Sequence, residues 1–209
     1  MVTSCLVSVT PATGYSGQNR RVQTLPVLVP IDMQQGFDLV TEKGAAWPPR
    51  WNTQLDVNGA RLLAHWRERQ WPVVHVRHDS VEPQSTLRVG QVGNDFRPGF
   101  EPQGDEQIVS KSVNAAFIGT DLDLRLRRLG ASEIVVFGIT TDQCVSTSVR
   151  VGANLGWKCT LVEDACDCFE LPLPQSGYLS ARDIHRAHVA TLAFEFCSVT
   201  TTSELVRHD

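Results

Sequence analysis

Short apolar runs alternate along this chain with segments of helical periodicity. The runs are rich in β-branched residues: LPVLVPID (25–32), WPVVHVRHD (71–79), EQIVSKS (106–112), SEIVVFGI (132–139) and KCTLVEDAC (158–166). The helical segments span 56–70, 120–130, 144–157 and 180–197. Strands that are apolar throughout need cover on both faces, which is typical of a parallel sheet between helices. We therefore expect an α/β fold, namely a three-layer α/β/α sandwich with a mainly parallel central sheet.

The length of the chain suits one domain. Its 209 residues can form one large hydrophobic core and leave little room for a second. Residues 1–24 are rich in Ser, Thr, Gly and Gln, so we interpret them as a flexible N-terminal arm and expect residues 25–209 to form a single domain. Residues 80–105 carry many Pro and Gly, which predicts a loop beside the functional site.

The C-terminal part predicts one long helix and a short strand. The spacing of the helix at 180–197 places Ile184, Ala187, His188, Thr191 and Leu192 on its inner side. We expect His185 and His188 to serve packing. The segment SVTTTSELV (198–206) predicts an edge strand followed by a tail.

The composition excludes several classes of function. The formal net charge is −4 and no Lys/Arg run stands out, so we expect no nucleic-acid partner. No window approaches 18 apolar residues and no secretory signal is apparent, so we expect no membrane span and a cytoplasmic protein. The six cysteines are expected to be reduced, and the C-x-C spacing at 166–168 does not suit a zinc site. We expect no metal and no cofactor.

Three reactive side chains follow or end three of the predicted strands. Asp32 ends the first, Lys111 ends the third and Cys144 follows SEIVVFGI at the start of a helix. Parallel sheets bind ligands at the carboxyl ends of their strands. Each residue alone has an ordinary explanation: a turn residue, a solvated amine or a buried small side chain. Their coincidence at one edge of the sheet indicates a catalytic site.

The chemistry of these groups suits acyl transfer to water. A thiol is nucleophilic as the thiolate, and a helix N-terminus and a nearby ammonium both lower the thiol pKa. We therefore expect Lys111 to lower the pKa of Cys144. Asp32 can take the thiol proton, pass it to a leaving amine and then activate water. Asp142 lies between the threonines and Cys144 and is expected to cap the helix rather than to act as the base.

Three blocks of the sequence resemble a known family. VLVPIDMQQGF, KSVNAAFIGTDLDLRLRRLG and VVFGITTDQCVSTSVRVGANLGWKCTLVEDA are similar to the signature blocks of the isochorismatase-like cysteine hydrolase superfamily. The resemblance implies that Asp32 is the general acid/base, Lys111 the thiolate stabiliser and Cys144 the nucleophile. It also implies a cis peptide between Ile139 and Thr140, with the amides of Thr140 and Cys144 forming an oxyanion hole, and a homo-oligomer (dimer or tetramer).

Departures from the family narrow the reaction. The family's nicotinamidases carry an Asp-x-His metal motif after the second strand, whereas this chain has HVRHDS there, with His78 and Ser80 at the corresponding positions. Members that cleave a vinyl ether do not need a thiol, so Cys144 favours hydrolysis of a C–N bond. HVRHDS followed by LRVGQVGNDFRP resembles a subgroup that includes streptothricin hydrolase.

Further residues are candidates for binding a small-molecule substrate. Each also has a structural alternative: a turn cap, a core ring or an ion pair with Asp79 or Asp95. The candidates are Gln34, Phe37, Arg77, His78, Phe117 and Ile139. Arg88 and Asn94 are weaker candidates in the 80–105 loop. Phe37, Trp47, Trp51 and Phe117 indicate a small, partly apolar amide.

The sequence thus predicts a metal-independent amidohydrolase that forms an acyl-thioester intermediate. One alternative is hydrolysis of a ureido or lactam bond by the same three residues. A second is a non-catalytic binding protein that retains the fold. A redox protein that uses Cys166 and Cys168 is a further alternative, which their one-residue spacing disfavours.

Overall fold

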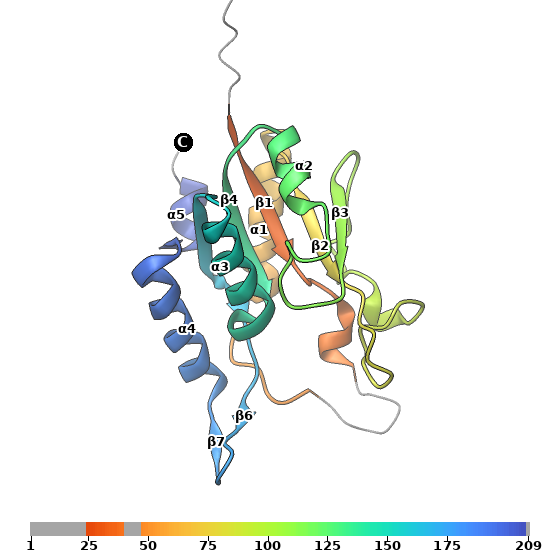
Figure 1. Ribbon diagram of the computed structural model, residues 1–209, viewed down its shortest axis with the longest axis vertical. Helices are drawn as coiled ribbons and strands as arrows, with labels where there is room; N and C mark the ends of the chain where they lie inside the picture. The colour runs from red at the N-terminus through yellow and green to blue at the C-terminus, as the bar shows by residue number, and fades with distance from the viewer. Residues whose placement is uncertain (1–23, 40–46, 208–209) are drawn as a thin grey trace, which may run out of the picture.

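The computed structural model describes residues 24–39 and 47–207, and its centre is a six-stranded parallel sheet (Figure 1). The spatial order is β3-β2-β1-β4-β5-β8. The strands are β1 (Leu25–Ile31), β2 (Val74–His78), β3 (Gln107–Lys111), β4 (Ala131–Ile139), β5 (Cys159–Asp167) and β8 (Ser198–Thr200). Every pair within this sheet is parallel. The strand order switches between β1 and β4: β2 and β3 lie on one side of β1, whereas β4, β5 and β8 lie on the other. Ligands bind at such a switch point in folds of this kind.

Helices cover both faces of the sheet. On one face α1 (Leu55–Glu68) packs on β5, β1 and β4 and on α5 (Thr202–Arg207). On the other face lie α2 (Leu122–Arg128), α3 (Ser146–Asn154) and α4 (Ala181–Glu195); Figure 1 shows α2 and α3 in front of the sheet and α1 behind it. The predicted three-layer α/β/α sandwich is confirmed. Among residues 24–39 and 47–207, none of the helices has the length and apolar character that a membrane span requires.

Gly138 lets the two central strands approach closely at their carboxyl ends. It pairs with Ile31 in the register of β1 and β4 and has φ of 136°. A Cβ atom at this position would lie 2.0 Å from the carbonyl oxygen of Ile31. Only glycine therefore fits, for both conformational and steric reasons. This contact brings Asp32, the next residue after β1, beside Ile139.

The C-terminal part differs from the prediction in two ways. The edge strand is present as β8, but the expected tail is the helix α5. The inner face of α4 is also rotated from the predicted one, because Ala187 and Thr191 are exposed and His188 is only half-buried. The buried residues are Ala181, Ile184, His185, Val189 and Leu192. The rotation buries Val189, a larger apolar side chain than Ala187, and so removes more apolar area from water.

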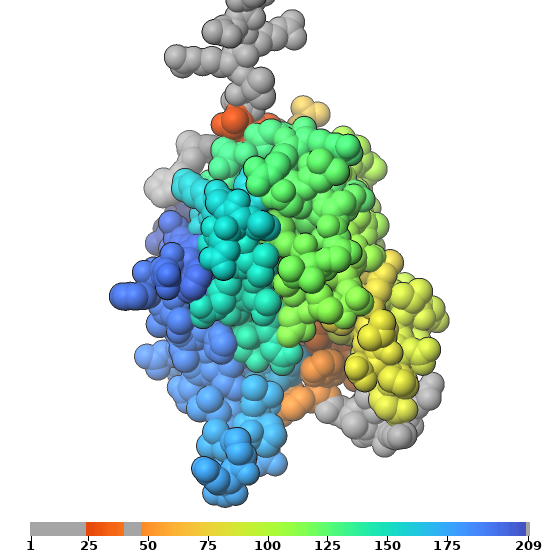
Figure 2. Space-filling view, in the orientation of Figure 1, coloured from red at the N-terminus to blue at the C-terminus, as the bar shows by residue number. Residues whose placement is uncertain are grey.

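Two segments project at the carboxyl end of the sheet. One is the hairpin of β6 (Leu171–Pro172) and β7 (Tyr178–Leu179), and the other contains the predicted 80–105 loop with the 3-10 turn η2 (Val92–Asn94). Figure 2 shows them on either side of a hollow, with the segment that follows β1 visible between them. That segment includes the 3-10 turn η1 (Gln35–Asp38), which contacts η2. The predicted N-terminal arm, apart from residue 24, lies outside the described residues.

Candidate functional site

Lys111 lies at the centre of a cluster at the carboxyl end of the sheet. Its Nζ is 2.7 Å from Oδ2 of Asp32, 2.8 Å from Nδ1 of His78 and 3.4 Å from Sγ of Cys144. Asp32 is 0% exposed, Lys111 2% and Cys144 8%. An ammonium has three N–H donors and no acceptor. All three donors of Lys111 are therefore directed at these three neighbours.

The strand order explains why distant residues meet here. Lys111 is the last residue of β3 and pairs in register with His78, the last residue of β2. Asp32 follows β1, and its backbone N–H donates to the carbonyl of Val76 in β2 (2.8 Å). Asp32 has a positive φ of 53°, which is uncommon outside glycine and turns the chain sharply at the end of the strand. Three adjacent strands thus deliver Asp32, His78 and Lys111 to one point.

Cys144 reaches the cluster from the other side. It belongs to the π-helical turn η3 (Thr141–Val145), which continues directly into α3. The peptide bond between Ile139 and Thr140, at the end of β4, is cis. The turn is held from behind, because the hydroxyl of Thr141 is hydrogen-bonded to the carbonyl of Asp167 (3.2 Å) and to Nδ1 of His185 (2.9 Å).

The thiol of Cys144 is more basic than a free thiol. Burial raises its pKa most, the charge of Asp32 raises it further, and the ammonium of Lys111 lowers it. The net direction is upward, so the sequence-based expectation of a lowered pKa is wrong for this arrangement. The ammonium is present as predicted, but the burial of the thiol and the carboxylate beside it outweigh its effect. The shift favours the neutral thiol, so an attack by Cys144 on a substrate requires a base.

Asp32 has an oxygen suited to that task. Its Oδ2 is bound to Lys111, whereas its Oδ1 is buried and has no hydrogen-bond partner among the described residues. Buried carboxylate oxygens are rarely left without a partner in folded proteins. The unpartnered oxygen thus marks a position where a proton or a ligand group is expected.

Asp32, His78 and Cys144 also form a set of groups that could ligate a metal ion, with one ligand atom from each lying within 4.8 Å of the others. Oxygen, imidazole nitrogen and thiolate are ligands that zinc accepts. Lys111 Nζ, however, contacts the same three side chains. A cation at this point would have to displace the ammonium, so Lys111 supplies the positive charge that a metal would bring.

Gln34 serves the architecture of the site. Its Oε1 accepts from the backbone N–H of His78 (2.8 Å), and its Nε2 donates to the carbonyls of His78 (3.1 Å) and Asn94 (2.9 Å). Asn94 Nδ2 donates to the same His78 carbonyl (3.0 Å) and to that of Leu87 (2.9 Å). The side-chain amides of Gln34 and Asn94 thus form hydrogen bonds with backbone groups and hold the backbone of His78 in place. Arg88, the other candidate in the loop, is exposed.

An aromatic cluster includes Phe37, which follows shortly after Asp32 in the chain. The rings of Phe37 and Trp47 have centroids 5.1 Å apart, and Trp47 stacks on Phe169 at 4.7 Å with an interplanar angle of 24°. Trp47 remains 36% exposed, as does Trp51, whose ring lies 4.8 Å from that of His185. Phe37 is therefore held in an aromatic group that is partly open to solvent, which keeps it a candidate for substrate contact.

Three other predicted substrate contacts, Arg77, Phe117 and Ile139, have structural partners in the fold. Arg77 forms an ion pair with Asp79 (2.8 Å) and does not bond to the Lys111 cluster. Phe117 packs against α3, where a Cβ atom added at Gly152 would lie 3.1 Å from its ring. Ile139 is fully buried at the end of β4. His78, unlike these three residues, bonds directly to Lys111.

Sequence reasoning missed several residues at the site. Asn114 Oδ1 lies 3.9 Å from Cys144 Sγ, and its only signal was its place three residues after Lys111. Phe169 joins the aromatic cluster from beyond β5. Asp167 is fully buried and its Oδ1 accepts from the backbone N–H groups of Asn52 (3.2 Å) and Cys168 (2.9 Å). Asp167 thereby fixes the segment at 50–52 next to the site.

The cysteines other than Cys144 are separate from the cluster. The five cysteines within the described residues are all free, and burial raises the pKa of Cys168 to about 12. Cys166 Sγ faces the carbonyl of Val162 (3.4 Å), whereas Cys168 Sγ faces that of Ala181 (3.0 Å). This arrangement does not favour a redox pair at 166–168.

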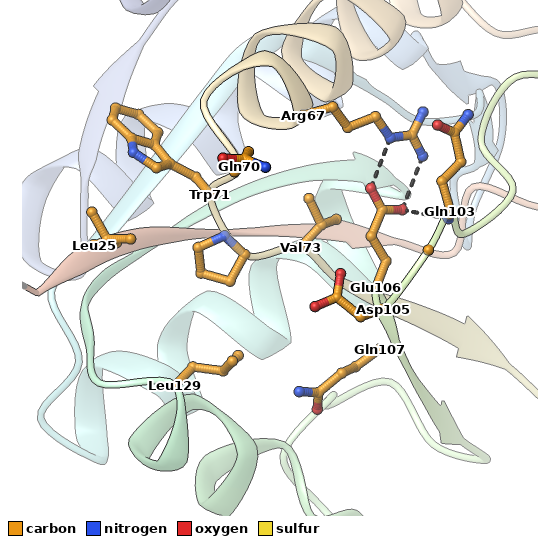
Figure 3. A pocket seen from close by; sticks show the side chains of 12 residues that line it. Leu25, Arg67, Gln70, Trp71, Val73, Gln103, Asp105, Glu106, Gln107 and Leu129 are labelled. Carbon is orange, nitrogen blue, oxygen red and sulfur yellow. Dashed lines mark hydrogen bonds and ion pairs between the residues drawn. The ribbon is translucent and has the colours of Figure 1, made fainter.

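A cavity of about 530 Å³ lies at the amino end of the sheet, away from the Lys111 cluster (Figure 3). Its lining includes Leu25, Trp71 and Glu106. Glu106 is bound by Arg67 (2.7 Å) and by His75 (2.8 Å), and Figure 3 shows its carboxylate facing Arg67. Its charge is already paired, so this cavity offers no reactive group comparable to Cys144.

Comparison with known proteins gives consistent results. The family model of the isochorismatase domain matches residues 26–204. The isochorismatase family protein YrdC of Bacillus subtilis (strain 168) is 34% identical over 179 residues, covering 86% of this chain and 93% of that protein. A streptothricin hydrolase of Streptomyces noursei is 28% identical over 151 residues, covering 69% of this chain and 50% of that enzyme. The crystal structure of an isochorismatase-family protein from Chromobacterium violaceum ATCC 12472 superposes with a TM-score of 0.80 at 40% identity, covering 87% and 92% of the two chains.

Proposed function

The chain belongs to the isochorismatase family of hydrolases, and we propose that it cleaves the C–N bond of a small amide with Cys144 as nucleophile and Asp32 as general acid/base. The family membership agrees with the resemblance of the three sequence blocks. The observation that carries the proposal is the position of Lys111 Nζ between Asp32 Oδ2 and Cys144 Sγ. The ammonium of Lys111 holds the base and the thiol together in a buried site.

The first half of the reaction forms an acyl-enzyme. Asp32 Oδ1 removes the proton from Cys144 as the sulfur attacks the substrate carbonyl, and Lys111 stabilises the negative charge on the sulfur. The backbone N–H groups of Thr140 and Cys144 hold the developing oxyanion at the start of the helical segment. Asp32 then gives the proton to the leaving nitrogen, which departs as an amine or as ammonia and leaves a thioester on Cys144.

The second half releases the product. Asp32 is again a carboxylate and takes a proton from a water molecule as the water oxygen attacks the thioester. The tetrahedral intermediate expels the sulfur, which regains the proton from Asp32, and a carboxylic acid leaves. Lys111 provides charge stabilisation throughout, and no step requires a metal.

The surroundings support a small substrate. Trp47 and Trp51 are each 36% exposed, and Trp47 belongs to the cluster with Phe37. Aromatic side chains of this kind bind apolar and planar groups. We therefore propose a small, partly apolar amide; ureido and lactam bonds are alternative targets of the same three residues.

Ammonia or amine release from a panel of primary amides, ureas and lactams, with nicotinamide included, tests the proposal. Turnover of a small amide is expected, and Cys144→Ser should reduce it to background. Cys159→Ser is the matched control, because Cys159 is also buried but is the first residue of β5, away from the Lys111 cluster. Unchanged turnover in Cys144→Ser, or turnover confined to large polycationic substrates, would contradict the proposal.

A further inference from the structure

His78 is the most exposed of the four side chains in the Lys111 cluster. Asp32, Lys111 and Cys144 are all buried, whereas His78 is half-buried at the end of β2. His78 is therefore the member of the cluster with the most contact with solvent. Its Nδ1 is already bonded to Lys111 Nζ at 2.8 Å.

The bond to Lys111 decides which ring nitrogen of His78 carries a proton. An ammonium can only donate, so Nδ1 of His78 must be the acceptor. Burial and the charge of Lys111 lower the pKa of His78, against the smaller effects of Asp32 and Asp79. The ring is thus neutral, and a neutral imidazole with an acceptor at Nδ1 has its hydrogen on Nε2. Lys111 fixes His78 as a hydrogen-bond donor at Nε2.

The backbone of His78 is held so that this donor has a defined position. Gln34 binds both its N–H and its carbonyl, and Asn94 binds the carbonyl a second time. Gln34 is fully buried and Asn94 is 4% exposed. Rigid support of this kind is typical of residues that orient a substrate.

The charges around His78 are balanced. Lys111 is paired with Asp32 (2.7 Å), and Asp79 is paired with Arg77 (2.8 Å). A neutral donor in a balanced field suits a neutral oxygen acceptor better than an ion.

We propose that His78 binds the substrate through its Nε2–H group, which donates to a carbonyl oxygen on the atom next to the reacting carbon. This oxygen is distinct from the one held by the N–H groups of Thr140 and Cys144. The inference rests on the proposed function.

Two substitutions separate the roles of the two ring nitrogens. In His78→Asn the side-chain oxygen can replace Nδ1 as acceptor for Lys111, but the donor at Nε2 is lost. In His78→Gln the amide N–H can replace the donor at Nε2, but the acceptor near Lys111 is lost. Neither variant changes Asp32 or Cys144, and thermal melting followed by circular dichroism reports whether each is folded.

The readout is the alkylation rate of Cys144 with two reagents, followed by peptide mass spectrometry at pH 9. Iodoacetamide carries a carbonyl oxygen, whereas iodomethane has the same leaving group and no oxygen. A change in thiol ionisation affects both rates equally, so their ratio reports the contact with the carbonyl. We expect His78→Asn to lower the iodoacetamide-to-iodomethane ratio by roughly tenfold and His78→Gln to retain it.

An unchanged ratio in His78→Asn would overturn the inference, because it would show that His78 acts only through Lys111. The ¹⁵N spectrum of histidine in the wild-type protein gives a second test that needs no variant. A proton on Nε2 of neutral His78 is expected, and a proton on Nδ1 would overturn the inference. Failure of the proposed function has a different signature, namely amide turnover that survives Cys144→Ser.

Discussion

Nζ of Lys111 lies 2.7 Å from Oδ2 of Asp32, with both side chains sealed from solvent. A buried charge pair is costly to form, and it is far more costly to break by removing one partner. The pair is therefore a structural element as well as a functional one. Its two members come from β3 and from the end of β1, with β2 between them in the sheet.

Removal of the ammonium alone should destabilise the fold. Lys111→Met preserves much of the side-chain volume but leaves Asp32 as an unpaired buried carboxylate, so we expect a loss of about 3–5 kcal/mol in the free energy of unfolding. The double variant Asp32→Asn/Lys111→Met should be more stable than Lys111→Met alone. Urea titrations measure both. Lys158→Met is the control, because Lys158 is exposed and its pair with the partly buried Glu133 lies at the surface, so its loss should shift the urea midpoint far less than Lys111→Met does. A double variant less stable than Lys111→Met would contradict the pairing.

Asp32→Asn should separate thiol ionisation from turnover. The carboxylate of Asp32 raises the pKa of Cys144, whereas Lys111 lowers it. Without the carboxylate the pKa of Cys144 falls, and alkylation by iodoacetamide at pH 7 should become faster. Amide turnover should nevertheless drop by about a thousandfold, because the general acid/base is gone. Slower alkylation together with normal turnover would show that Asp32 is not the base.

His185 should make the protein sensitive to mild acid. Burial lowers the pKa of His185 to about 4, from an ordinary value of 6.5. The unfolded chain then binds a proton between these pH values that the folded protein does not bind, so stability falls as the pH drops from 6.5 towards 4. Between pH 7 and pH 5 this amounts to about 2 kcal/mol. Urea unfolding at the two pH values should show a loss of stability that is smaller in His185→Gln than in the wild-type protein by this amount. An identical loss in both proteins would show that other groups cause it.

Gly138 should tolerate no side chain. A methyl group there would lie 2.0 Å from the carbonyl oxygen of Ile31, at a φ of 136°. Gly119 also has a positive φ, 70°, but no atom lies within 4 Å of the added Cβ. We expect Gly119→Ala to cost about 1 kcal/mol and Gly138→Ala to prevent stable folding or to cost far more. Gly119→Ala introduces conformational strain alone, whereas Gly138→Ala adds a steric clash, and thermal melts of the two variants compare these effects. Equal melting temperatures would show that β1 and β4 can move apart easily.

The sequence predicted the parts of the site that depend on local pattern. Asp32, Lys111 and Cys144 each follow or end an apolar run, and a parallel sheet necessarily aligns the ends of its strands. The layers of the fold were predictable for the same reason. The helix α5 was missed because its six residues carry too weak a periodicity to distinguish it from a tail.

Other properties depend on contacts between distant segments. Gln34 binds the backbone of His78, 44 residues away, and nothing around Gln34 in the sequence indicates that its amide is used there. The direction of the Cys144 pKa was mispredicted because burial outweighs the charge of Lys111, and burial follows only from the packed fold. The contact of Phe169 with Phe37 and Trp47 could not be predicted either, because Phe169 follows β5 and is distant from both residues in the sequence.

The central claim is that Cys144 carries the acyl group during turnover. The most direct measurement is to mix the enzyme with its best amide from the panel, to quench it in acid within the first turnovers, and to map the acyl mass by peptide mass spectrometry. The proposed mechanism predicts an acyl-thioester on Cys144 and none on Cys197, which is the more exposed thiol. An acyl group on another residue, or undiminished turnover in Cys144→Ser, would contradict it.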